Sequence, residues 1–192
     1  SSSNASKDCI FQAVLTQIPF DGWTDTAYAA GLKQAECTAA EVKRHFPNGL
    51  RDVIDYFGLV ADDAMQQRMD HDRGFARMKV REKITFAVRA RLEFLTPHRE
   101  AMRRLLIWYA MPQHVVMGIK RAAKTVDLMW IAAGDTATDY NRYTKRILLA
   151  GVLKATMLFW LGDETEDCEA TWEFLDRRMA EVMRLGKSLS LL

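Results

Sequence analysis

The chain has 192 residues, of which 49% are hydrophobic and 27% are charged, enough for one compact domain or for a small module joined to a larger one. Its net charge of 27 − 25 = +2 is too small to indicate a nucleic-acid-binding protein by itself. The three cysteines form no CxxC pair, which argues against a zinc site or a disulfide framework and favours free thiols in a reducing compartment.

The N-terminal third predicts short helices. Apolar residues in the segment 10–18 recur at the spacing of one helix face. A short helix is expected over about 25–30, and Gly31 is expected to end it, because glycine readily adopts the left-handed conformation that closes a helix. Thr38, with Glu41 three residues later, has the pattern of a capping box, which predicts the start of a third helix.

A fourth, longer helix is expected from Leu50 onward. Three short helices followed by a longer one predict a helix-turn-helix module over 6–58. A DNA-reading helix needs basic or amide side chains at its start, but here that position holds Ala39, Ala40 and Glu41. Since the glutamate would be repelled by phosphates, we expect the geometry of a DNA reader without its chemistry, and no nucleic acid as a partner.

The second predicted domain, 59–192, consists of longer helices. Asp139 is expected to cap one of them, and Gly186 is expected to end the last. No segment shows the alternation of a strand, so we predict an all-α fold. No apolar run of about 18 residues is present, so we expect no transmembrane helix. The helices are expected over about 80–95, 102–109, 115–133, 140–161 and 166–185.

The residues carry no pattern of a catalytic or metal site. None of the four histidines follows a glutamate by three residues, so the iron motif of helical bundles is missing. No HExxH, GxSxG or nucleotide-binding glycine pattern occurs. His114, near a helix start, is expected to make a local polar contact. We therefore expect a protein that is not an enzyme and needs no cofactor.

Several features leave two interpretations open. The apolar residues on the later helices suit either a core or a ligand site between helices, and methionine in particular fits irregular ligands. Trp172 suits either a core position or a partly exposed anchor for a partner. The segment 65–104 has 11 basic and 5 acidic residues, whereas the segment 162–192 has 4 basic and 8 acidic residues. This uneven charge suits either solvated helix faces or surfaces for a membrane or a partner.

The segment 127–146 contains a long and unusual motif. It reads Asp-x-x-Trp-x-x-Ala-Gly-Asp-x-x-x-Asp-x-Asn-x-Tyr-Thr-Lys-Arg. With further matches over about 10–186, it resembles the family of coenzyme Q (ubiquinone) biosynthesis accessory proteins known as the ninth protein of that pathway. The further matches are Phe20-x-Gly22-Trp23-Thr24, Phe46-Pro47-x-Gly49, Arg91-Leu92, Pro112, Thr156 and Thr171-Trp172-x-Phe174-Leu175-x-x-Arg178.

The resemblance implies a tetracycline-repressor-like fold whose helix-turn-helix does not act on DNA, a homodimer, and a hydrophobic cavity in the larger domain. It implies binding of an isoprenoid quinone intermediate or phospholipid, which is presented to the di-iron demethoxyubiquinone hydroxylase. On this basis, the expected lipid-binding residues are Met102, Leu106, Tyr109, Val116, Ile119, Met129, Trp130, Tyr143, Ile147 and Gly151. The expected partner-binding residues are Phe159, Leu161, Asp163 and Trp172.

The location of the protein also follows from the resemblance. Eukaryotic members carry a further amphipathic helix that docks on membranes, but no basic amphipathic pattern is visible in 188–192. We therefore expect no more than peripheral contact with a membrane surface. No mitochondrial presequence is seen, which favours a bacterial, cytoplasmic protein at the inner membrane. In a eukaryote, the matrix side of the mitochondrion is expected.

The polar residues of the motif have two interpretations. Asp135 and Asp139 flank a turn between two long helices, and Lys145 and Arg146 are expected to pair with these or other carboxylates. Such pairs either fix the corner or form a polar gate at a cavity mouth. The competing interpretation of the whole chain is a ligand-responsive transcriptional regulator of the same fold, which would bind specific DNA sequences.

Overall fold

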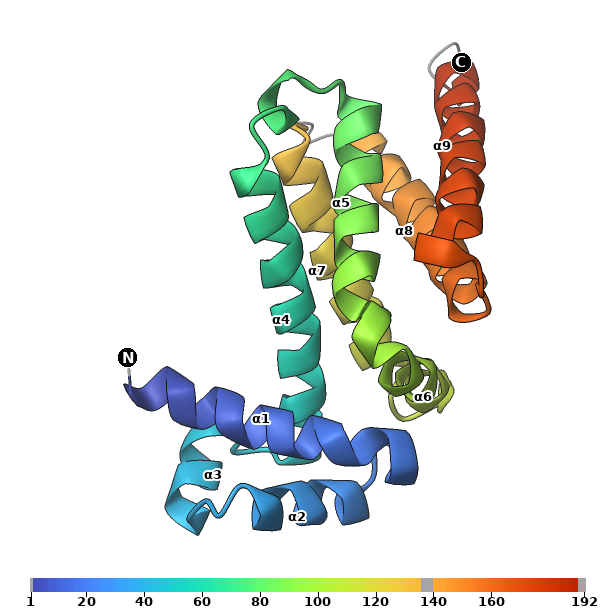
Figure 1. Ribbon diagram of the computed structural model, residues 1–192. Coiled ribbons are helices and arrows are strands. Elements are labelled where there is room, and N and C mark those ends of the chain that lie inside the picture. Colours follow the sequence, from blue (N-terminus) through green and yellow to red (C-terminus); the bar gives the residue numbers. More distant parts are fainter. Residues whose placement is uncertain (1, 136–139, 190–192) are drawn as a thin grey trace. The chain divides into compact units, whose positions relative to one another are not determined.

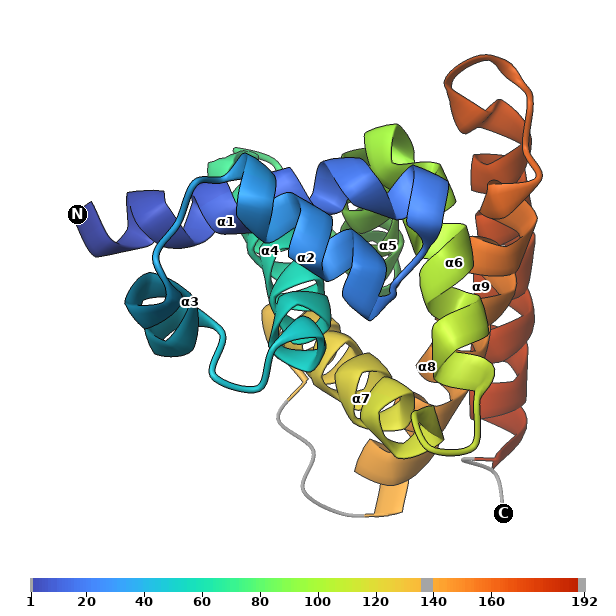
Figure 2. The same ribbon diagram turned by 90° about the horizontal axis from the view of Figure 1, so that it is seen from below.

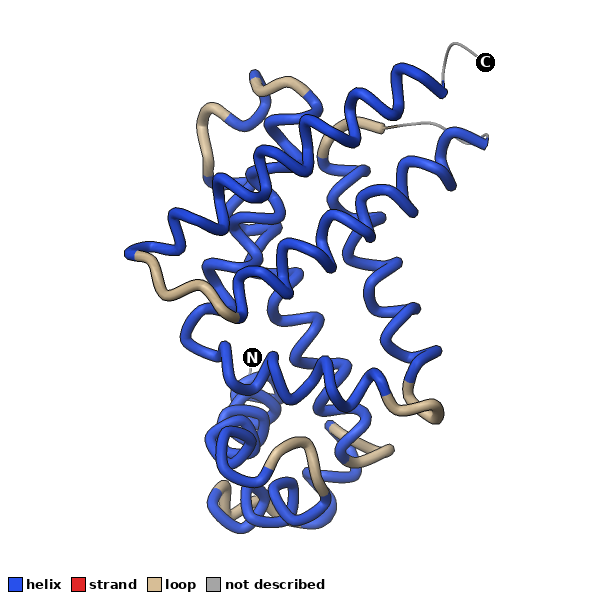
Figure 3. The backbone as a smooth tube through the Cα atoms, turned by 90° about the vertical axis from the view of Figure 1, so that its right-hand side faces the viewer, coloured by secondary structure: helices blue, strands red, loops and turns tan. Residues whose placement is uncertain are grey.

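The computed structural model describes residues 2–135 and 140–189, and every regular element in these ranges is a helix (Figure 3). The predicted all-α class is therefore confirmed. The helices form two compact units, which are described separately. The N-terminal unit comprises the residues up to Ala61 together with Pro97–Gly118, and the C-terminal unit comprises Asp62–Thr96 and the described residues from Ile119 onward.

This grouping differs from the predicted division into 6–58 and 59–192, because a later helix packs with the first ones. Helix α6 (Arg99–Ala110) lies in the N-terminal unit beside α1 (Ser2–Asp21). Trp23, buried after the end of α1, donates from Nε1 to the carbonyl of Ala101 on α6 at 2.9 Å. That packing could not be read from the local pattern of either segment.

The remaining helices of the N-terminal unit are α2 (Asp25–Gln34), α3 (Ala39–His45) and the first part of α4 (Leu50–His71), and Figures 1 and 2 show α1 crossing α2. The capping box of α3 is confirmed: the backbone N–H of Glu41 donates to Thr38 Oγ1 at 3.2 Å, and that of Thr38 donates to Glu41 Oε2 at 2.8 Å.

The predicted end of α2 at Gly31 is wrong, because the helix continues to Gln34. Gly31 lies where α2 meets α1, and a Cβ atom added there would stand 2.4 Å from Val14 Cα. The residue is small because two backbones approach closely at this point, and its conformation is helical.

The C-terminal unit contains the second part of α4, α5 (Val80–Leu95), most of α7 (Val115–Ala132), α8 (Tyr140–Leu161) and α9 (Glu169–Leu189). Short 3-10 turns precede α5 (Phe75–Arg77), follow it (Thr96–His98) and precede α9 (Glu166–Cys168). Helices α8 and α9 lie side by side (Figures 2 and 3).

Two predictions about the ends of the later helices have different outcomes. The predicted end at Gly186 is wrong: α9 continues through it, and no atom outside its own helix would meet a Cβ there. Glycine ends a helix only where the chain turns into the left-handed conformation, and Gly186 does not. The predicted cap at Asp139 lies outside the described residues.

None of the described helices is both long enough and apolar enough to cross a membrane.

Candidate functional site

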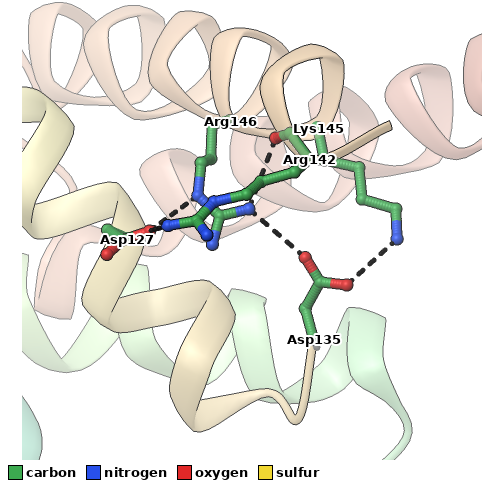
Figure 4. Close-up of polar contacts among 5 residues, drawn as sticks. All are labelled: Asp127, Asp135, Arg142, Lys145 and Arg146. Carbon is green, nitrogen blue, oxygen red and sulfur yellow. Dashed lines mark hydrogen bonds and ion pairs between the residues drawn. The ribbon is translucent and has the colours of Figure 1, made fainter. Parts of the chain in front are cut away.

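Charged residues of the central motif tie α7 to α8 (Figure 4). Arg146 Nε donates to Asp127 Oδ1 at 2.7 Å, and Arg146 Nη1 lies 3.3 Å from Asp135 Oδ2. Lys145 Nζ lies 3.2 Å from Asp135 Oδ1, and Arg142 Nη2 lies 3.4 Å from Asp127 Oδ1. The predicted pairing of Asp135 with Lys145 and Arg146 is confirmed.

Arg146 lies at the centre of this corner between α7 and α8, because its guanidinium contacts the carboxylates of both Asp127 and Asp135. Arg142 lies four residues earlier, so the two side chains share one face of α8. No role was predicted for Asp127 or Arg142, which lie further apart in the sequence than Asp135 and its partners. The contacts bind the end of α7 to the beginning of α8, which is the geometry of a corner-fixing motif.

Trp130 covers the apolar side of this corner and is 8% exposed. Lys145 Nζ lies 5.7 Å from the centre of the Trp130 ring, within the range of a cation–π contact. The backbone N–H of Asp135 donates to the carbonyl of Trp130 at 3.0 Å as the chain leaves the helix. Within the described part of the chain, no acceptor meets the buried Nε1 of Trp130.

A buried charged cluster joins α4, α5 and α7. Asp62 and Arg91 are 2% and 5% exposed, and Arg91 Nε donates to Asp62 Oδ1 at 2.9 Å. Thr125 Oγ1 donates to the same oxygen at 2.9 Å, and Arg121 Nη1 lies 3.6 Å from Asp62 Oδ2. This cluster was not predicted from the sequence. The available signal was that both Asp62 and Arg91 interrupt the apolar face of a helix.

The predicted lipid-binding residues fall into both units and range from buried to exposed, so their common role stays a prediction. Met102, Met129 and Trp130 are buried, and Leu106 and Tyr109 are partly buried. Gly151 is exposed, and the side chains exposed by 61 to 72% are Val116, Ile119, Tyr143 and Ile147. Met102, Leu106, Tyr109 and Val116 lie in the N-terminal unit, and the other six lie in the C-terminal unit.

One face of α8 is apolar and exposed. Tyr143, Ile147, Gly151 and Leu158 lie on it, interrupted by Lys154, since residues about four apart share a helix face. The exposed fractions of the three large side chains are 67%, 72% and 54%. Large exposed apolar side chains gathered on one helix face suit contact with a lipid or another protein.

The end of α8 and the beginning of α9 carry the predicted partner-binding residues. The rings of Phe159 and Phe174 stack with their centres 4.6 Å apart, and Phe159 is 38% exposed. Trp172 is half-buried: its Nε1 donates to the carbonyl of Asp167 at 2.7 Å, and the Arg89 guanidinium lies 4.9 Å from its ring centre. Trp172 is therefore not fully buried as a core residue would be, and its role as an anchor for a partner stays a prediction.

Asp163 lies in the turn between these helices and is 6% exposed. Its carboxylate accepts from the backbone N–H groups of Thr165 at 2.9 Å and Thr171 at 2.8 Å, and from both hydroxyls. Burial raises the pKa of this carboxyl, but the four hydrogen bonds outweigh that effect and lower the pKa to about 2. Asp163 therefore holds the turn between α8 and α9, and its predicted contact with a partner stays a prediction. Leu161, just before it, is half-buried.

Exposed carboxylates surround the aromatic residues of this region. Between residues 164 and 173, the exposed acidic side chains are Glu164, Glu166, Asp167, Glu169 and Glu173. No basic residue lies in this segment of the sequence. The segment that leads into α9 is therefore acidic, while the Arg89 guanidinium lies on the Trp172 ring itself.

One prediction about local chemistry is confirmed. His114 makes the expected local contact, since its Nδ1 lies 3.0 Å from the carbonyl of Trp108 and its ring stacks on that indole with centres 3.5 Å apart. All three cysteines are free. In the ranges 2–135 and 140–189, no three histidine, cysteine, aspartate or glutamate side chains come close enough to hold a metal ion.

The sequence of the chain is similar to proteins named for ubiquinone biosynthesis. Residues 115–186 match the family model described as COQ9. The chain is 30% identical over 186 residues to the ubiquinone biosynthesis protein COQ9, mitochondrial, of Xenopus tropicalis, which covers 94% of this chain and 58% of that protein. It is 29% identical over 183 residues to the Homo sapiens protein of the same name, a match that covers 92% of this chain and 57% of that protein. The predicted resemblance is confirmed. The chain spans less than two thirds of the length of these relatives.

Among solved structures, a TetR transcriptional regulator from Nitrosomonas europaea is similar to this chain with a TM-score of 0.75. The identity is 20%, and the match covers 91% of this chain and 96% of that one. The predicted tetracycline-repressor-like fold is therefore confirmed. At this identity the similarity concerns the fold alone.

Proposed function

We propose that this chain, a relative of the COQ9 proteins, is a non-catalytic accessory protein of ubiquinone biosynthesis that binds an isoprenoid quinone intermediate or a phospholipid. The observation that carries the proposal is sequence similarity over 94% of the chain to a protein named for ubiquinone biosynthesis. The bound lipid is presented to the di-iron demethoxyubiquinone hydroxylase, which supplies the catalytic metal.

The physical task explains why such a protein is needed. A quinone head must leave the bilayer to reach a soluble active site, while its isoprenoid tail is costly to expose to water. Each methylene removed from water contributes roughly 0.8 kcal/mol, so a long tail binds well to a non-specific apolar surface. The exposed apolar face of α8 (Tyr143, Ile147, Gly151 and Leu158) supports the proposal as a surface that a lipid, or a second copy in a homodimer, would cover.

Organic extraction of the purified protein, followed by mass spectrometry, tests lipid binding. We expect an isoprenoid or phospholipid to be extracted with the full chain, and we expect Ile147→Glu to lower its amount, because the added charge makes the α8 face polar. Lys154→Glu is the matched control on the same face, since it exchanges one charged side chain for another. Equal lipid content in all three proteins would remove the α8 face from the lipid site.

The acidic segment 164–173, which includes Trp172, suits a partner with basic side chains around an apolar pocket. Complementary charges speed association and are screened by salt, so binding to the hydroxylase is expected to weaken as the ionic strength rises. The half-buried indole, fixed by its hydrogen bond to the Asp167 carbonyl and by Arg89, has the rigidity of an interface anchor.

Trp172→Lys is expected to weaken binding of the hydroxylase about 30-fold, the effect of losing an interface anchor worth about 2 kcal/mol. Titration calorimetry of the two purified proteins measures the affinity, and circular dichroism checks that the helical content is kept. Phe20→Lys is the control, because Phe20 is 80% exposed and lies on α1. Unchanged affinity of the Trp172 variant would take this residue out of the interface.

A ligand-responsive transcriptional regulator is the second candidate, favoured by the structural similarity to a TetR regulator. The position of Glu41 argues against it: hydrogen bonds from the backbone and side chain of Thr38 lower the pKa of its carboxyl, so a negative charge stands at the start of α3. Gel-shift assays with DNA flanking the gene separate the candidates. A regulator would give sequence-specific binding that falls steeply with salt.

The location remains part of the proposal. The relatives are named as mitochondrial proteins. For this chain we propose a peripheral position at the membrane that holds the quinone. That is the matrix side of the inner membrane in a mitochondrion and the cytoplasmic side in a bacterium.

A further inference from the structure

A groove of about 900 Å³ lies within the C-terminal unit, formed by the 3-10 turn before α5, the first turns of α5 and one residue of α9. Its cationic lining residues are Arg77, Lys79, Arg81 and Arg89, and its apolar ones include Met78 and Phe86. It contains none of the predicted lipid-binding or partner-binding residues.

The lining of the groove has a net positive charge. It holds four basic residues and two acidic ones, Glu82 and Asp176. Glu82 accepts from the backbone N–H of Lys79 at 2.7 Å. Arg77 and Lys79 are both exposed, and neither forms an ion pair with a carboxylate of the described residues. Both cations are therefore available to an anion from outside.

The other two cations are held in place by the protein. Arg81 Nη2 donates to the carbonyl of Asp176 on α9 at 3.3 Å, which joins the two sides of the groove. Arg89 pairs with Glu93 at 2.7 Å and stacks on Trp172. The groove also lies at the N-terminus of α5, a helix of 16 residues, where the helix dipole adds positive potential.

Apolar side chains accompany these cations. Met78 and Phe86 are half-buried in the groove, and Phe86 packs edge-on against Phe75 with ring centres 5.5 Å apart. Val80, beside them, is 45% exposed. Cations bordering apolar side chains match the boundary between phosphate headgroups and acyl chains at a bilayer surface. A polar anion such as free phosphate would leave the apolar side chains in water.

We propose that this groove docks the protein on a bilayer through the phosphate groups of anionic phospholipids, with Arg77 and Lys79 as the main contacts. The inference goes beyond the proposed function, because it assigns the surface that meets the membrane and does not depend on a lipid bound elsewhere. Each basic residue near an anionic surface raises membrane partitioning roughly fivefold, so two residues contribute roughly 25-fold.

Co-sedimentation of the full chain with vesicles tests the proposal. We expect binding to vesicles of phosphatidylcholine and phosphatidylglycerol (about 3:1), weaker binding at higher salt, and little binding to phosphatidylcholine alone. Arg77→Glu with Lys79→Glu is expected to lower the partition coefficient at least 25-fold, by the same estimate. The matched control is Lys43→Glu with Arg44→Glu, which reverses two exposed charges on α3.

Four results would overturn the proposal: no preference for anionic vesicles, equal losses in the groove and control variants, displacement of bound protein by millimolar inorganic phosphate, or tighter binding to duplex DNA than to vesicles. Arg77→Gln with Lys79→Gln provides a milder second variant, which is expected to lose roughly 25-fold or less. Lipid extraction tests the proposed function, and sedimentation tests membrane docking through the groove. A negative result in one experiment therefore does not contradict the other proposal.

Discussion

Replacing Asp62 with alanine is expected to lower the free energy of unfolding by about 4 kcal/mol, the usual effect of removing one partner from a buried ion pair. Asp62 is 2% exposed and accepts from Arg91 and Thr125, with Arg121 Nη1 at 3.6 Å. Without the carboxylate, positive charge in the interior of the C-terminal unit loses the partner that offsets its lost hydration. Urea denaturation followed by circular dichroism measures the change.

The neighbouring residue supplies the control for this experiment. Asp63 is exposed, so Asp63→Ala removes the same chemical group one position away and is expected to change the stability by less than about 0.5 kcal/mol. Replacing the pair by apolar residues, Asp62→Leu with Arg91→Met, is expected to be less harmful than Asp62→Ala, because it removes a buried charge together with its partner. Equal stabilities of the Asp62→Ala and Asp63→Ala variants would contradict the role given to the cluster.

Asp163→Asn is expected to lower the free energy of unfolding by about 3 kcal/mol at pH 7, because the carboxylate accepts charge-assisted hydrogen bonds in a buried turn. An asparagine carries one acceptor oxygen, and its amide group would face the donors of Thr165 or Thr171. Urea denaturation of both proteins at pH 7, 4 and 2.5 measures the difference. Glu164→Gln is the control, because Glu164 is exposed in the same turn.

The pH dependence gives this prediction a second readout. The pKa of Asp163 is about 2 in the folded chain, below the ordinary value of 3.8. A carboxyl whose pKa is lower in the folded state stabilises the fold above the unfolded value, and that contribution is lost as the pH falls from 3.8 through about 2. The difference between the wild type and Asp163→Asn should therefore shrink toward pH 2.5. A constant difference would contradict the ionised state assigned to Asp163.

Local sequence signals predicted the helices well, because capping and apolar spacing act within a few residues. Thr38 and Glu41 form the capping box that their spacing predicted. The two glycine predictions failed for different reasons. Gly31 is a point of close packing, which only its contact with Val14 on another helix reveals, whereas Gly186 lies within α9 and meets nothing outside that helix.

The polar contacts of the C-terminal unit were only partly predictable. Asp135 lies near Lys145 and Arg146 in the sequence, and their pairing was expected. Asp62 and Arg91 are 29 residues apart on different helices, so no local pattern joins them. Asp163 entered the partner-binding set through the resemblance alone, and the structure shows that its oxygens are occupied by the turn.

Mass spectrometry of organic extracts from the purified full chain tests the central claim, lipid binding, most directly. The expected result is an isoprenoid quinone or a phospholipid in amounts comparable to the protein, in repeated preparations. Protein first stripped of lipid should take up an isoprenoid quinone or phospholipid when it is offered. Extracts without lipid in several preparations, together with no uptake of either offered lipid, would contradict the claim.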